Sequence, residues 1–190
     1  MASEVELLEA WRGGDLLAAD ELLRRHFDAL YRFFRAKVNN HVEDLVQRTL
    51  LACVEGMDRI GEASFRSYLF GVARHKLMDH LRHHYRRGEE VDLLELSVRD
   101  LGTSPSRRIA RRDGQSVLLA AMQTLPMDSQ ILLELVYWEG LSGKEIAAVL
   151  EIGENTVRSR LSRARVAVRA ALEDAIGVDA AADLFAGRQT

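Results

Sequence analysis

Apolar residues recur at helical spacing along almost the whole chain of 190 residues, with no convincing run of alternating β-branched residues. The pattern therefore predicts an all-α fold. Residues 4–38 are expected to form two helices separated at Gly13-Gly14, the second beginning near Asp15. That second helix is strongly amphipathic. Its expected core residues are Leu22, Leu23, Phe27, Leu30, Phe33 and Phe34.

The next predicted helix, over residues 42–57, has one apolar stripe and one mixed face. The stripe consists of Val42, Leu45, Val46, Thr49, Cys53 and Val54. The mixed face consists of Asp44, Gln47, Arg48, Leu51 and Glu55. A leucine among polar residues on an exposed face suggests contact with a partner, although single exposed leucines are common on protein surfaces.

A loop over residues 58–64 precedes a long predicted helix over residues 65–87, and Ser64 is expected to cap this helix. The face expected to point outward carries Tyr68, Arg74, His75, Arg82 and Arg86. Basic residues interleaved with an aromatic residue are typical of single-stranded nucleic-acid binding, because arginines hold the backbone while rings stack on unpaired bases. A solvated basic helix with a partly buried Tyr68 explains the same pattern equally well.

The first half of residues 88–112 is acidic, and a turn-forming segment follows at 102–106, which predicts an acidic flexible linker. Two helices are expected next, over residues 111–124 and 126–138, with Pro126 in the first turn of the second. The second is expected to be a core helix. Its apolar residues are Ile131, Leu132, Leu135, Val136 and Trp138. The tail over residues 176–190 has little pattern.

Two helical patterns meet across a short turn between Glu139 and Leu172. Ser142 and Glu145 have the capping-box spacing at the start of the first helix. A break containing Gly153 follows, and Asn155 is expected to cap the second helix. This arrangement predicts a helix-turn-helix.

The second of these helices carries five arginines and no acid between Arg158 and Arg169. The residues expected to face the core are Val157, Leu161, Ala164 and Val168. Those on the opposite face are Arg158, Ser159, Ser162 and Arg163, with Arg160 and Arg165 on the flanks. Such a helix suits the major groove of DNA, where central side chains reach base edges and flanking guanidiniums hold phosphates. The alternative is an ordinary basic surface helix.

These residues resemble a known family. EGLSGKEIAAVLEIGENTVRSRLSRAR, residues 139–165, is similar to the promoter-recognising domain of the ECF (extracytoplasmic-function) sigma factors of bacterial RNA polymerase. The resemblance continues in EDLVQRTLLACVEGM and RIGEASFRSYLFGVARHKLMDHLR and covers about residues 5–172. Glu151 stands where the family commonly has glycine. If Glu151 adopts a left-handed conformation, the cost relative to glycine is about 1 kcal/mol.

The resemblance implies two small helical domains, over residues 1–87 and 113–175, without catalytic activity. The residues implied in binding the polymerase are Asp44, Gln47, Arg48 and Leu51. Those implied at the minus-ten element, read as single strands, are Arg59, Ser64, Tyr68, Arg74, His75 and Arg82. At the minus-thirty-five element, the residues expected to contact bases are Arg158, Ser159, Ser162 and Arg163. Those expected to contact phosphates are Thr156, Arg160 and Arg165.

Core RNA polymerase and promoter DNA, duplex and single-stranded, are the partners that the resemblance implies, and it allows for an anti-sigma factor. The net charge of −3 argues against nucleic-acid binding only as a total, since the order along the chain is basic, acidic, basic. The single cysteine excludes an internal disulfide and suits a reducing cytosol. With no signal peptide and no apolar run of membrane-spanning length, a cytoplasmic location and no membrane contact are expected.

Two alternatives use the same residues differently. A stand-alone helix-turn-helix regulator with a helical sensor domain explains the arginine helix but not the basic and aromatic helix over residues 65–87. A metal-dependent enzyme would use the cluster of His75, His80, His83 and His84. Because Asp79 is the only carboxylate within that cluster and no cysteine lies nearby, neither a metal nor another cofactor is expected.

Overall fold

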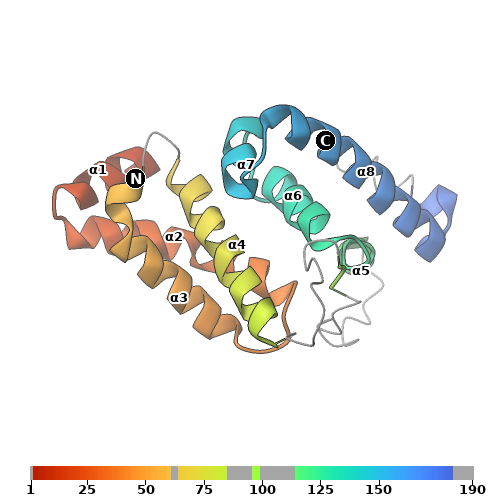
Figure 1. Ribbon diagram of the computed structural model, residues 1–190, viewed down its shortest axis with the longest axis horizontal. Coiled ribbons are helices and arrows are strands. Elements are labelled where there is room, and N and C mark those ends of the chain that lie inside the picture. The colour runs from red at the N-terminus through yellow and green to blue at the C-terminus, as the bar shows by residue number, and fades with distance from the viewer. Residues whose placement is uncertain (1, 61–63, 85–95, 99–113, 182–190) are drawn as a thin grey trace.

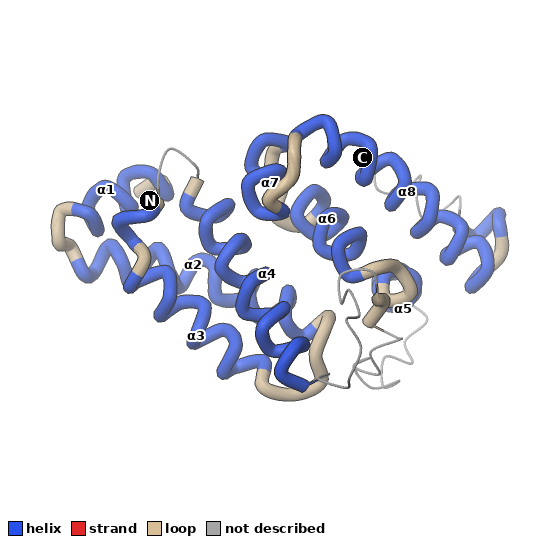
Figure 2. The backbone as a smooth tube through the Cα atoms, viewed as in Figure 1, coloured by secondary structure: helices blue, strands red, loops and turns tan. Residues whose placement is uncertain are grey.

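A computed structural model describes residues 2–60, 64–84, 96–98 and 114–181, and within these residues every regular element is a helix (Figure 2). The elements are α1 (Glu4–Arg12), α2 (Leu16–Arg35), α3 (Val42–Glu55), the 3₁₀ turn η1 (Met57–Arg59), α4 (Phe65–His84), α5 (Gly114–Met122), α6 (Met127–Tyr137), α7 (Gly143–Leu150) and α8 (Glu154–Ile176). The predicted all-α fold is confirmed.

The first two helices begin at side chains that satisfy their free amide groups. Ser3 and Glu6 form a reciprocal capping box at α1, and these hydrogen bonds lower the pKa of the Glu6 carboxyl. The Asp15 carboxylate accepts from the amides of Leu17 and Ala18, at 2.9 and 3.2 Å, at the start of α2. The predicted break at Gly13-Gly14 therefore separates two independently capped helices.

Helices α1 to α4 pack into a bundle around large, fully buried side chains (Figure 1). Leu22, Leu30 and Phe34 of α2 are completely buried, as their spacing predicts. The Trp11 ring meets the Phe65 ring edge to face, with 6.1 Å between centroids. Aromatic pairs of this geometry contribute beyond the apolar area that they bury, so this pair stabilises the contact between α1 and α4.

Three predictions of buried residues are wrong. Phe27 is 43% exposed, Val54 is 46% exposed and Trp138 is 45% exposed. Phe27 and Val54 lie beyond the edge of the stripe that their helices bury. Trp138 lies just after the last residue of α6. Phe27 stacks instead on the ring of Tyr31, at 6.4 Å between centroids.

One buried apolar cluster joins the N-terminal helices to the C-terminal ones. It contains Leu69 and Leu77 of α4 together with Ile131 of α6, Ile146 of α7 and Val157 of α8. Figure 1 shows α4 lying between α3 and the pair α6 and α7, and α4 contacts α7 directly. A second, smaller cluster fills the space between α5 and α8. The two halves of the chain therefore share a core.

The described part of the predicted linker is a short packed segment. Val98 is fully buried, and the carbonyl of Leu96 accepts from the amide of Met127 at 3.0 Å. Ser97 pairs with Pro126 in an isolated antiparallel bridge. Pro126 caps α6 rather than lying in its first turn, which corrects the prediction. The rest of the acidic linker and the end of the tail, residues 182–190, lie outside the described residues.

The Cys53 thiol should react with a disulfide reagent such as DTNB only as fast as the protein unfolds. The side chain is fully buried and burial raises its pKa to about 12, so thiolate is scarce at neutral pH. A Cys53→Ala, Leu51→Cys variant is the matched control, because Leu51 is exposed on the same helix. Its thiol should react rapidly, whereas rapid reaction of native Cys53 would contradict the buried position.

Candidate nucleic-acid interface

Helices α7 and α8 and the turn between them form the predicted helix-turn-helix. Ser142 and Glu145 form the predicted capping box, with the amide of Glu145 donating to the Ser142 hydroxyl at 3.3 Å. Glu151 ends α7 in the left-handed conformation, at φ 57° and ψ 41°, which is the case that the sequence left conditional. Helix α8 begins at Glu154, close to the predicted start, but its N-cap is Gly153, so the prediction that Asn155 caps the helix is wrong. The Asn155 side chain accepts from Arg158 instead, at 3.5 Å.

The faces of α8 lie as its periodicity predicts. Val157, Ala164 and Val168 are buried and Leu161 is half-buried against the other helices. The exposed residues expected to contact DNA are Thr156, Arg158, Ser159, Ser162, Arg163 and Arg165. This surface carries the exposed positive charge that a phosphate-lined groove attracts.

The two flanking arginines have different surroundings. The Arg165 Nε donates to the Tyr137 hydroxyl at 2.7 Å, and its guanidinium lies 5.7 Å from the centre of the Tyr137 ring. This contact holds an exposed cation in one orientation. Arg160 forms an ion pair with Asp128 of α6 and is only partly exposed. Its charge is therefore neutralised in this structure.

Helix α4 does not present its predicted basic face fully to solvent. Arg74, which the sequence places on the outer face, is only 8% exposed. Its guanidinium lies 3.6 Å from an Asp128 carboxylate oxygen and 3.8 Å from a Glu151 oxygen. The His75 imidazole also lies 3.2 Å from Glu151, whereas Arg82 is exposed and pairs with Asp79. The C-terminal helices therefore cover the middle of this face.

Tyr68 is half-buried, as expected if α4 is a solvated basic helix with a partly buried tyrosine. Its hydroxyl donates to the carbonyl of Gly56 at 3.2 Å. A Cβ at position 56 would lie 2.1 Å from the Tyr68 hydroxyl, so only glycine allows this close approach. The hydrogen bond ties α4 to the end of α3, immediately before η1.

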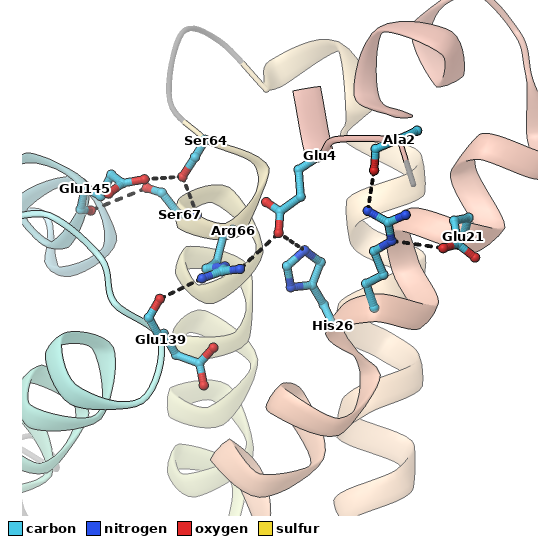
Figure 3. Close-up of polar contacts among 10 residues, drawn as sticks. Ala2, Glu4, Glu21, His26, Ser64, Arg66, Ser67, Glu139 and Glu145 are labelled. Atoms are coloured by element: carbon cyan, nitrogen blue, oxygen red, sulfur yellow. Dashed lines mark hydrogen bonds and ion pairs between the residues drawn. The ribbon is translucent and has the colours of Figure 1, made fainter. Parts of the chain in front are cut away.

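The loop before α4 is described only at its ends, where Arg59 is exposed and Ser64 is half-buried. Ser64 caps α4 as predicted, accepting from the amide of Ser67 at 3.2 Å. Its hydroxyl also donates to the Glu145 carboxylate of α7 (Figure 3). Partial burial raises the pKa of Glu145, but hydrogen bonds from Ser64 and Ser142 outweigh this effect and lower it.

Sequence reasoning assigned no role to Arg66, which joins three parts of the chain (Figure 3). Its guanidinium donates to the carbonyl of Glu139 at 2.8 Å and to the Glu4 carboxylate at 3.0 Å. Glu4 also lies 3.3 Å from the buried His26 imidazole, whose pKa is lowered by burial. The partners lie 62 and 73 residues from Arg66 in sequence, so no local pattern indicates this cluster.

The predicted polymerase-binding residues share the exposed side of α3. Asp44 and Arg48 form an ion pair at 2.9 Å, and Gln47 is exposed. Leu51 is 56% exposed and Val54, three residues later, is 46% exposed. The two apolar side chains make the surface more suitable for a protein partner than sequence alone indicated. Their spacing of three residues on a helix is the signal that could have found Val54.

Among the described residues, no group of three or more histidines, cysteines or carboxylates is placed to hold a metal ion. None of the described helices is long and apolar enough to cross a bilayer. The His84 side chain is not described.

Two family models match the chain, one in its N-terminal half and one in its C-terminal half. The Sigma-70 region 2 model matches residues 22–87, and the model for Sigma-70, region 4 matches residues 115–168. The fold and these regions define a sigma-70-class protein.

Known proteins agree with this class. A probable RNA polymerase sigma factor, RfaY of Xanthomonas campestris pv. campestris, is 34% identical over 67% of this chain and 33% of its own length. The ECF RNA polymerase sigma factor SigE of Mycolicibacterium smegmatis is 32% identical over 79% of this chain and 60% of its own length. The chain thus spans about a third and three fifths of these two relatives. The solved structure of CnrH in complex with the cytosolic domain of CnrY is similar with a TM-score of 0.66 and 25% identity, covering 92% of this chain and 99% of that one.

The chain belongs to the ECF sigma factors of RNA polymerase, which confirms the resemblance seen in its sequence.

Replacing Glu151 with glycine should stabilise the protein relative to replacing it with glutamine. Both changes remove the carboxylate, so their difference isolates the left-handed backbone. We expect Glu151→Gly to exceed Glu151→Gln in free energy of unfolding by roughly 0.5–1 kcal/mol. Urea unfolding measures the difference, and equal stabilities would show that the turn carries no strain at this residue.

Proposed function

We propose that the protein binds core RNA polymerase and directs promoter-specific initiation, reading duplex DNA with α8 and single-stranded DNA with the start of the α4 region. The observation that carries this proposal is the exposed, acid-free arginine face of α8, which follows a capped helix and a tight turn. Family membership supplies the partner, because a sigma factor acts with the polymerase.

In this proposal α8 enters the major groove of the minus-thirty-five element. Arg158, Ser159, Ser162 and Arg163 reach base edges, since they are exposed along the centre of the helix. Thr156 and Arg165 contact phosphates from the flanks. Arg160 joins them only when it separates from Asp128.

The N-terminal helices supply two further surfaces. Asp44, Gln47, Arg48 and Leu51 of α3 dock on the polymerase. The minus-ten element is held as a single strand by Arg59, Ser64, Tyr68, Arg74, His75 and Arg82. We assign residues 1–87 and 113–175 to two functional domains on this basis, with residues 88–112 as the connection.

A protein regulator is part of the proposal. CnrH, which is similar over nearly all of this chain, was solved in complex with the cytosolic domain of another protein, CnrY. We infer that this chain also binds a protein partner, which we propose to be an anti-sigma factor that holds it when it is not engaged with the polymerase.

Transcription in vitro with core polymerase on a library of promoters tests the proposal. The protein should select a common promoter class, and Leu51→Glu should raise the protein concentration needed by roughly tenfold because it places a charge in the docking surface. Since Leu51 is 56% exposed, the thermal stability of this variant should be unchanged. Specific DNA binding without polymerase, together with no transcription, would instead indicate a stand-alone regulator.

Arg165→Ala and Arg163→Ala should weaken promoter binding in different ways. Loss of a phosphate contact at Arg165 should lower affinity for all sequences and reduce the salt slope by about one. Loss of a base contact at Arg163 should cost about 1–3 kcal/mol at one promoter position. Tyr137→Phe is the matched control, because it removes the hydrogen bond to Arg165 but keeps the charge and should leave the slope unchanged. An unchanged slope in Arg165→Ala would exclude a phosphate contact.

A further inference from the structure

The short 3₁₀ turn η1 ends at Arg59, a residue that we propose to contact the single strand. The turn consists of three residues, none of which is buried. Hydrogen bonds in such turns have poor geometry, and a turn without a buried residue gains little from packing. The position of the exposed Arg59 side chain therefore depends on what holds the backbone on either side of the turn.

Side chains from two other helices hold the backbone at the two ends of η1. Before the turn, Tyr68 of α4 donates to the Gly56 carbonyl at 3.2 Å. After the turn, the guanidinium of Arg12, the last residue of α1, donates to the Ile60 carbonyl. A hydrogen bond from a charged donor is stronger than one between neutral groups. The Ile60 side chain is buried as well, so the end of η1 next to Arg59 is fixed to α1.

Helix α1 also contacts the first residues of α4, on the other side of the loop. The Trp11 ring meets the Phe65 ring at 6.1 Å between centroids. The Glu4 carboxylate accepts from the Arg66 guanidinium at 3.0 Å (Figure 3). One helix therefore contacts the chain on both sides of the loop before α4.

We propose that Arg12 is a positioning residue for the single-strand site: its hydrogen bond to the Ile60 carbonyl holds η1 so that the Arg59 guanidinium is ready to meet a phosphate of single-stranded DNA. This inference rests on the proposed function, since it takes Arg59 as a contact with the minus-ten strand. A group that is already ordered loses less conformational entropy when its ligand binds, so Arg12 raises the affinity without touching the DNA. Helix α1 lies before residue 22, where the match to Sigma-70 region 2 begins.

A double-mutant cycle between Arg12 and Arg59 tests the proposal. Fluorescence anisotropy measures binding of a fluorescein-labelled single-stranded oligonucleotide of mixed sequence by Arg12→Ala, Arg59→Ala and the double variant. We expect Arg12→Ala to weaken binding about tenfold when Arg59 is present, and by no more than about twofold when Arg59 is already alanine. A direct contact of Arg12 with the DNA, or a general loss of structure, would give equal losses in both backgrounds and overturn the proposal.

Arg24→Ala is the matched control for the loss of one positive charge. Arg24 is exposed on α2, and its ion-pair partner Asp20 lies one turn away on the same helix. This variant should bind the oligonucleotide as tightly as the wild type does. A loss equal to that of Arg12→Ala would show that net charge determines the affinity, and the positioning role would be wrong.

Hydrogen exchange reports on the turn itself, without DNA. The Arg59 amide donates to the Gly56 carbonyl at 2.9 Å. The Ile60 amide donates to the Met57 carbonyl at 3.1 Å. We expect both amides to exchange about tenfold faster in Arg12→Ala, because releasing the Ile60 carbonyl allows the turn to open locally. Unchanged exchange of both amides would overturn the proposal.

Arg12→Met covers loss of folding in Arg12→Ala, since it keeps the apolar part of the side chain and removes every donor. The same faster exchange and the same dependence on Arg59 are expected, and their absence in this variant overturns the proposal. Failure of the proposed function has a different signature. A wild-type protein that does not bind the oligonucleotide would refute the single-strand function and this inference with it. Binding by the wild type, with independent effects of Arg12 and Arg59, would refute the inference alone.

Discussion

Helix α4 is packed from two sides, and this packing decides which polar groups the rest of the protein exposes. Leu69, Leu77 and Leu81 are completely buried, in the cluster shared with α6 and α7. A helix covered in this way cannot leave a guanidinium on the covered side without an acidic partner, because a buried, unpaired charge is costly. The position of Asp128 beside Arg74 follows from that constraint.

Glu151 shows how the same constraint reaches the helix-turn-helix. A left-handed glutamate costs about 1 kcal/mol relative to glycine, and an ion pair made by an exposed carboxylate such as that of Glu151 returns only about 0–1 kcal/mol. The two effects roughly cancel, so overall stability does not explain the glutamate. Its distinctive consequence is that the turn of the DNA-reading motif carries a carboxylate that contacts α4, which glycine cannot provide.

The sequence predicts the helices and the faces of α8 because both depend on local periodicity. It predicts Leu22 and Phe34 as core correctly, but it misjudges Phe27 and Val54, since spacing gives the direction of a side chain and not the width of the buried stripe. It also predicts that Arg74 lies on the solvent-facing side of its helix. A polar residue on a helix face looks solvated until another part of the chain covers it, and Lys37 and Glu134, 97 residues apart, meet only in the folded protein. The roles of the proposed contact residues remain predictions.

The contact between α4 and the C-terminal helices restricts how a partner could separate them. A ligand shifts an equilibrium only when it binds the two forms with different affinity. The face of α3 around Leu51 is exposed while α4 contacts α7, so a polymerase that touched only this face would not favour separation of these helices. Separation would require a second contact that is available only when α6 and α7 have left α4. Because Arg160 pairs with the same Asp128 that faces Arg74, a DNA phosphate that drew Arg160 away would remove a cation from that carboxylate. If α8 binds DNA as proposed, Asp128 therefore links that surface to Arg74 of α4.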